Sequence, residues 1–199
     1  MEHFLNILLL VVGFISFIPV INLFNTSEEM KYRCLKFLMN ATFMWTLLIF
    51  AEQFSTNVNI VYYAHMLGYP LKFLMAIFMM CTIYNYVEKK FPKWQIIGLG
   101  IVFVVEYLLA ITNARTQFIL ELVPGDVVSF ESLYDASTGP LFIYHLAAVY
   151  LLLVISIVYL AIFLTKHKEV RHYKIVSRTM TYSVIIVLFF NALQLLAVK

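Results

Sequence analysis

Six long runs of apolar residues, separated by short polar clusters, dominate the pattern of this chain. The runs cover residues 4–24, 36–52, 58–86, 94–113, 140–165 and 179–198. A helix needs about 20 apolar residues to cross the hydrocarbon of a bilayer. The pattern therefore predicts an all-α membrane protein, a bundle of about six transmembrane helices. The third run is the longest, and we expect a kink at its Pro70.

Composition supports the same class. Apolar residues make up 63% of the chain and charged residues 13%, whereas soluble proteins carry roughly 25% charged residues. A soluble fold could not keep so much apolar surface away from water, so we treat residues 1–199 as a single transmembrane domain. The first run follows Glu2 and His3 rather than a basic stretch and has no small-residue cleavage site, which favours a retained helix over a signal peptide.

Basic residues gather in alternate connections between the runs. Cytoplasmic loops of membrane proteins carry an excess of Lys and Arg, so these connections are predicted to be cytoplasmic and the N-terminus extracellular. We expect the same residues to contact anionic lipid and not nucleic acid. The first, third and fifth connections hold or adjoin Lys31, Arg33, Lys36, Lys89, Lys90, Lys93, Lys166, Lys168, Arg171, Lys174 and Arg178.

The long outer connection, residues 114–139, has a β-like pattern. Residues 118–123 and 127–132 are β-prone runs, and Pro124-Gly125-Asp126 between them is a turn sequence. We therefore predict a small extracellular β-hairpin between the fourth and fifth helices. It would be either a lid that closes the bundle or a lid that contacts a ligand.

Polar residues inside the apolar runs are the candidate functional groups. An ionisable side chain at the bilayer centre costs about 2.5–3.5 kcal/mol on insertion scales, so each needs a partner or a wet cavity. Helical spacing places several of them on common faces in the outer half of the membrane. We predict an outward-opening, ligand-binding pocket with a Lys72–Glu106 ion pair. Its candidate residues are Trp45, Glu52, Tyr62, His65, Tyr69, Lys72, Glu106, Asn113 and His145.

Structural explanations compete with this pocket. Aromatic residues near helix ends serve as interface anchors, and Asn and Gln join helices by hydrogen bonds. The lone His65 and His145 are weak evidence for a haem or metal site. Cys34 and Cys81 indicate neither a disulfide framework nor zinc. No catalytic motif is present, so we predict no enzyme activity, catalytic residue, metal or cofactor for these residues.

Several short signatures follow one another in a characteristic order. Because of these signatures and their order, the chain resembles the seven-transmembrane N-terminal sensor domain of bacterial histidine kinases and diguanylate cyclases. The family also has a seventh helix and a cytoplasmic output domain, which we expect to lie outside these residues. The matching pieces are Trp45 with Glu52, Tyr69-Pro70 with Phe78 and Tyr84, Thr112-Asn113, Gly139-Pro140 with Phe142 and Tyr150, and Asn191.

The resemblance implies a sensory input domain that signals to a kinase or cyclase in two-component or cyclic-nucleotide signalling. Its ligand would be a small extracellular or membrane-dissolved molecule, and a second copy of the chain is a further candidate partner. The alternative is a small transporter or channel subunit that uses the intramembrane charges as a substrate path, although the chain has no internal repeat. A structural module without a ligand is the third option.

Overall fold

Four long helices make up most of the described part of the computed structural model. The structure describes residues 30–87, 92–127, 132–133 and 136–166, together with 178, 181, 182 and 185. The helices are α2 (Met30–Phe54), α3 (Val58–Tyr86), α4 (Lys93–Thr116) and α6 (Phe142–Lys166). Each is long and apolar enough to cross a membrane. The all-helical membrane class is therefore confirmed at this level.

The predicted spans compare well with these bounds. The third run, 58–86, coincides with α3, while α2 begins six residues before the predicted 36–52. The run 94–113 and the run 140–165 differ from α4 and α6 by three residues or fewer at each end. The first run, 4–24, lies outside the described residues. The sixth, 179–198, is described only at residues 181, 182 and 185, which are helical.

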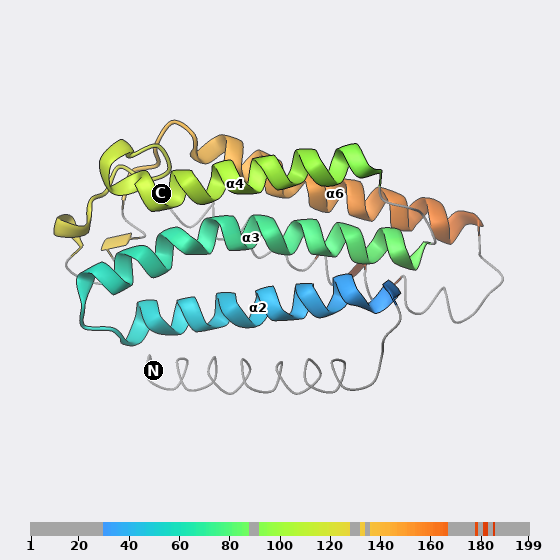
Figure 1. Ribbon diagram of the computed structural model, residues 1–199, viewed down its shortest axis with the longest axis horizontal. Coiled ribbons are helices and arrows are strands. Elements are labelled where there is room, and N and C mark those ends of the chain that lie inside the picture. Colours follow the sequence, from blue (N-terminus) through green and yellow to red (C-terminus); the bar gives the residue numbers. More distant parts are fainter. Residues whose placement is uncertain are drawn as a thin grey trace.

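Helix α3 is the central element of the described bundle. It packs against α2, α4 and α6, and Figure 1 shows it running between α2 and α4. Half of the apolar stretch of α3 that could cross a membrane is buried, whereas 11% of the corresponding stretch of α4 is buried. It continues through Pro70, whose fixed φ is compatible with a helix although its nitrogen cannot donate. A polar side chain on α3 can therefore meet side chains from three neighbouring helices.

A tight turn joins α2 to α3 and aligns the end of α2 with the start of α3. The backbone N–H of Asn57 donates to Ser55 Oγ at 3.1 Å, and Asn57 Oδ1 accepts from the N–H of Asn59 at 3.0 Å. Asn57 is thus the N-cap of α3 and satisfies one of the free N–H groups of its first turn. The turn holds the last turn of α2 beside the first two turns of α3.

The outer connection does not show the predicted hairpin in its described part. Pro124–Asp126 forms a short 3₁₀ turn, η1, and Leu120 makes an isolated antiparallel bridge with Thr138. The N–H groups of Glu121 and Gly139 donate to Ser137 O and Ile119 O at 2.9 and 2.8 Å. Part of the run 118–123 therefore pairs with the segment leading into α6, while residues 128–131 of the second predicted strand lie outside the described residues.

Gly139 lies where this segment crosses the end of α4. A Cβ at this position would lie 2.3 Å from Gln117 O and 2.5 Å from Phe118 O. Both are backbone atoms, which cannot move aside as a side chain can. The close approach explains in steric terms why glycine begins the Gly-Pro signature seen in the sequence.

The loop between α4 and α6 then folds back over the bundle and forms a lid. Leu120 and Leu122 are buried in one apolar cluster with Tyr62 and Tyr69 of α3. The cluster is completed by Val61, Met66, Ala110, Ile119, Val127 and Leu133. The loop thus closes the end of the bundle where α3 begins and α4 ends by ordinary core packing, worth roughly 25 cal/mol for each Å² of apolar surface removed from water.

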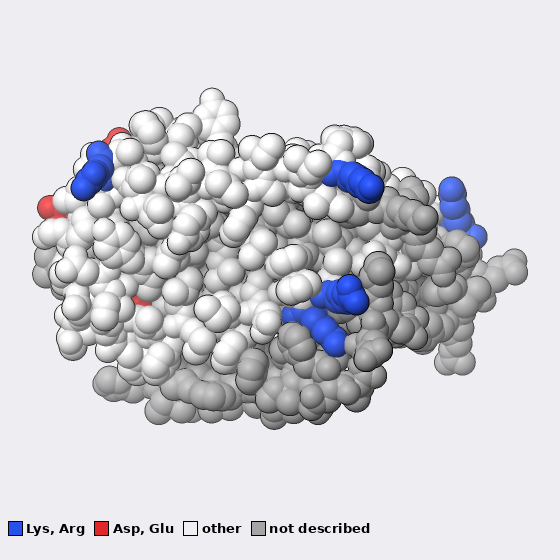
Figure 2. Space-filling model, viewed as in Figure 1, with Lys and Arg blue, Asp and Glu red and all other residues white. Residues whose placement is uncertain are grey.

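Charged residues divide between the two ends of the described bundle. One end, where α2 begins and α3 ends, carries Arg33, Lys36, Lys93 and Lys166. Figure 2 shows most of the blue basic atoms toward that end and the red acidic atoms toward the other. The predicted cytoplasmic residues Lys89 and Lys90 lie outside the described residues.

Candidate functional site

A buried histidine–carboxylate pair joins α2 to α3. His65 Nδ1 lies 2.6 Å from Glu52 Oε1, and the side chains are 12% and 5% exposed. Glu52 stands in the last turn of α2 and His65 in the second turn of α3, so the tight connection between the helices brings them together. Because an ionised carboxylate only accepts hydrogen bonds, Nδ1 is the donor.

A second pair of the same kind joins α4 to α6. His145 Nδ1 lies 2.7 Å from Glu106 Oε2, with side chains 5% and 8% exposed. Glu106 is near the middle of α4, and His145 is in the first turn of α6. A buried charge is tolerated only with a matched partner, so each pair lowers the cost of keeping a carboxylate inside the membrane.

Tyr69 lies between the two pairs. Its hydroxyl is 3.3 Å from His65 Nε2, the ring nitrogen that does not face Glu52. Its ring meets the His145 ring edge-on, with centroids 5.2 Å apart, and the Phe142 ring at 6.1 Å. One aromatic side chain of α3 therefore connects polar groups from α2, α3, α4 and α6. We call Glu52, His65, Tyr69, His145 and Glu106 the polar cluster.

Lys72 lies beside this cluster without joining either pair. Its Nζ is 5.4 Å from the centroid of the Tyr69 ring and 6.0 Å from that of Trp45. These are cation–π distances. The predicted ion pair with Glu106 is wrong, because that carboxylate is occupied by His145 and Lys72 has no salt bridge among the described residues. Lys72 instead contacts the aromatic side chains between α2 and α3.

Asn113 and Tyr62 hold the lid. Asn113 Nδ2 donates to Tyr62 Oη and to Leu120 O, each at 3.0 Å. Asn113 Oδ1 accepts from the N–H groups of Ile119 and Leu120 at 2.8 and 3.2 Å. Tyr62 Oη in turn donates to Leu122 O at 3.2 Å. Three of the four hydrogen bonds of this amide go to the loop backbone and the fourth goes to Tyr62 of α3, which is a structural role.

The structure thus separates the sequence candidates into three groups. Glu52, His65, Tyr69, Glu106 and His145 form the polar cluster, and Trp45 with Lys72 lies next to it. Tyr62 and Asn113 hold the lid. The face shared by the candidates of α3 was visible from helical spacing, but the two histidine–carboxylate pairs were missed, because spacing within a helix does not show which neighbour its face meets.

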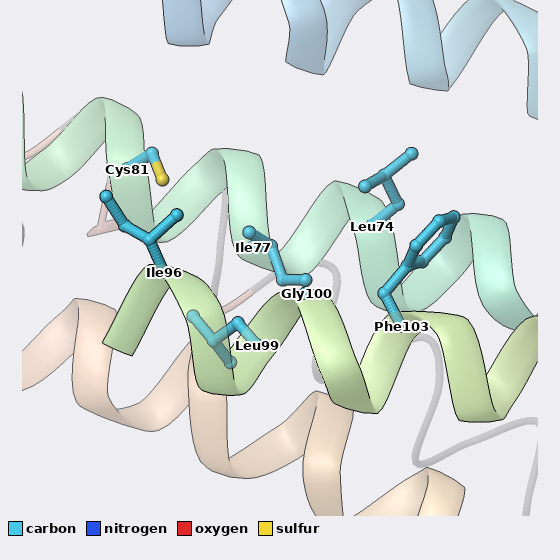
Figure 3. A pocket seen from close by; sticks show the side chains of 7 residues that line it. All are labelled: Leu74, Ile77, Cys81, Ile96, Leu99, Gly100 and Phe103. Atoms are coloured by element: carbon cyan, nitrogen blue, oxygen red, sulfur yellow. The ribbon is translucent and has the colours of Figure 1, made fainter. Parts of the chain in front are cut away.

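A small apolar groove lies elsewhere on the bundle, between α3 and α4. Its volume is about 170 Å³. Figure 3 shows its lining side chains, from Leu74, Ile77 and Cys81 of α3 and Ile96, Leu99, Gly100 and Phe103 of α4. It contains no charged group, so it differs from the predicted outward-opening polar pocket. Within the described ranges, no three His, Cys, Asp or Glu side chains gather as a metal site.

Comparison with known proteins gives one match. The family model for the N-terminal 7TM region of histidine kinase matches residues 8–199. No curated protein and no solved structure matches the chain. The match extends over nearly the whole sequence, including α2, α3, α4, α6 and the loop that forms the lid.

Proposed function

The chain belongs to the family of N-terminal seven-transmembrane regions of histidine kinases, and on that premise we propose that its polar cluster binds a small ligand and passes the signal to a cytoplasmic kinase. The observation that most supports this proposal is that two buried histidine–carboxylate pairs both contact Tyr69. Ionisable residues inside a membrane are expensive to insert, so their collection in one place favours a functional role over a purely structural one.

The position of Tyr69 supports a route for the signal. A ligand shifts a bundle between two arrangements only if it binds one of them better. A ligand that displaces the Tyr69 ring or hydroxyl would alter the contacts of both His65 and His145. These contacts extend to α2, α4 and α6, so a local change would bias the relative positions of four helices whose inner ends face the kinase.

The orientation that this proposal requires follows from charge. We place the N-terminus outside and the basic connections in the cytoplasm, with six spans in residues 1–199. The described basic residues Arg33, Lys36, Lys93 and Lys166 at one end of the helices support this orientation by the positive-inside rule. The polar cluster then lies in the outer half of the membrane, beneath the lid.

The test is a thermal-unfolding screen of the whole chain in lipid nanodiscs. The panel contains small carboxylic acids, amines, alcohols and amides. A ligand present at about a hundred times its Kd stabilises the folded state by about 2.7 kcal/mol. We expect at least one class to raise the midpoint, and Tyr69→Leu to abolish that increase. The matched control is Tyr107→Leu, because Tyr107 is 45% exposed on α4.

Two results would contradict the proposal. The first is a panel in which every stabilising compound acts equally on the wild-type chain and on Tyr69→Leu. The second is solute flux in proteoliposomes that depends on Glu52 and Glu106 while no compound stabilises the chain. That second pattern is the one expected of a transporter or channel subunit.

A further inference from the structure

Lys72 is the middle residue of α3, which runs from Val58 to Tyr86. Because α3 is long enough to span the membrane, its middle residue lies far from water at either end. Lysine side chains near helix ends can extend to the interface, but one at mid-helix cannot do so as easily. The ammonium group therefore needs a partner inside the protein.

The described bundle offers Lys72 no anion of its own. Its Nζ contacts only the aromatic faces of Trp45 and Tyr69. Glu52 acts on it electrostatically but forms no salt bridge with it, because the Glu52 carboxylate is bound to His65 at 2.6 Å. Glu106 is bound to His145. Each carboxylate of the cluster thus has a histidine partner, and Lys72 is left as the cation without a matched charge.

The ammonium group lies over the aromatic rings of Trp45 and Tyr69. The Trp45 indole packs against α3 at Gly68, with Nε1 4.0 Å from the position that a Cβ would take. The lid covers the outer end of the bundle with buried Leu120 and Leu122. A ligand that enters without moving the lid must come through the lipid, which favours an apolar molecule.

We propose that Lys72 binds the carboxylate of a small, membrane-dissolved organic acid, with Trp45 and Tyr69 against its apolar body. This rests on the proposed function and names the class of its ligand. A single negative charge would match Lys72, which has no salt bridge within the described ranges, whereas the second charge of a dianion would be repelled by Glu52. An organic acid can dissolve in the membrane in its protonated form, release its proton to interfacial water and bind Lys72 as the carboxylate. The charge-assisted bond that forms is among the stronger hydrogen bonds available in proteins.

Trp45 provides a reporter at the site. The chain has two tryptophans, and Trp94 is 72% exposed at the opposite end of α4 from the lid. In a Trp94→Phe background, the emission of Trp45 alone is followed in nanodiscs. The probes are decanoate, decanol and decyltrimethylammonium, which share one chain length and differ in charge. Each titration is corrected for partition of the probe into empty nanodiscs.

We expect decanoate to give a saturable change in Trp45 emission, and decanol and decyltrimethylammonium to give none. Lys72→Met should weaken decanoate binding by about tenfold to a hundredfold, the usual contribution of a hydrogen bond to a charged group. Lys72→Arg should restore most of the affinity, because it keeps the charge. Lys93→Met is the control, since Lys93 is exposed at the first residue of α4.

Three outcomes would overturn the inference: decanoate gives no saturable response, Lys72→Met binds it as well as the wild type does, or decanol binds equally well. The thermal screen separates this failure from failure of the proposed function. If an amine, alcohol or amide stabilises the chain through Tyr69 while decanoate does not bind, the sensory site stands and only the acid class is wrong. If no compound acts through Tyr69, both are wrong.

Discussion

Replacing Asn113 with alanine is expected to destabilise the folded chain by about 3–4 kcal/mol. The substitution removes four buried hydrogen bonds at once, and a typical bond contributes about 1 kcal/mol. It also leaves the N–H groups of Ile119 and Leu120 buried without an acceptor. The lid should detach from Tyr62 and α4 before the helices separate. Unfolding in mixed micelles, followed by circular dichroism, measures the loss.

Two further variants serve as controls for this prediction: one changes the same side chain to a carboxylate, and the other removes an exposed amide. Asn113→Asp keeps the two acceptor contacts and loses the two donor contacts, so it should lie between alanine and the wild type. Asn59→Ala changes an exposed amide and should leave stability unchanged. Limited proteolysis should cut residues 118–123 faster in Asn113→Ala. An Asn113→Ala chain as stable as the wild type, with an uncut lid, would show that this amide does not hold the loop.

Replacing Glu106 with alanine is expected to destabilise the bundle by about 2 kcal/mol. Interhelical hydrogen bonds within membranes average about 0.6 kcal/mol and reach about 1.7 kcal/mol in double-mutant cycles. The His145–Glu106 pair should exceed that average, because it is short and buried and can carry charge. Alanine leaves His145 Nδ1 without its acceptor, and the same unfolding measurement gives the cost.

A double-mutant cycle isolates the pair. Glu106→Leu with His145→Phe removes both partners and fills the space with apolar groups, so it should cost less than the two single changes added together. Glu106→Gln keeps an acceptor and should be the mildest single change. Glu121→Ala, an exposed carboxylate on the lid, is the control. Strict additivity of the Glu106 and His145 changes would mean that the two side chains do not interact.

Most of the helical architecture could be predicted from the sequence, because lipid imposes a length and a composition on each span. Residues 58–86 were predicted to be a helix and are α3. Helix ends were less well predicted, because polar residues such as Lys31 and Arg33 can continue a helix beyond the apolar run, as they do in α2. The predicted hairpin does not appear among the described residues of the loop, where Leu120 instead bridges Thr138, because β propensity does not determine the pairing partner.

The Lys72–Glu106 pair predicted from the sequence is not present among the described residues, and ligand binding at the site stays a prediction. Helical spacing placed Tyr62, His65, Tyr69 and Lys72 on one face of α3. In the structure the first three make side-chain hydrogen bonds, and the ammonium group of Lys72 lies over the Tyr69 ring. Spacing could not show the rotation of α4 and α6 against α3. That rotation decides that Glu106 meets His145 rather than Lys72. Asn113 was a ligand candidate from sequence because an amide in an apolar run has no visible partner until the loop is placed.

The polar residues that hold the lid and the polar residues that meet at Tyr69 would affect signalling differently. Tyr62 and Asn113 are hydrogen-bonded to each other and to the lid, so a ligand would have to break these bonds to use either side chain. Tyr69 contacts both imidazoles through one hydroxyl and one ring face, which a ligand can replace at lower cost. Under the proposed function Tyr69 is the better switch, because its contacts connect separate helices.

Nitrogen NMR of the imidazoles, in nanodiscs with labelled histidine, tests the central claim that Tyr69 joins two histidine–carboxylate pairs into one cluster. His65→Gln and His145→Gln assign the two signals. The account predicts that both Nδ1 atoms carry a proton bonded to a carboxylate, that Tyr69→Phe shifts His65 Nε2, and that Tyr69→Leu shifts both imidazoles. Imidazoles without a carboxylate-bound proton, or unmoved by Tyr69→Leu, would contradict it.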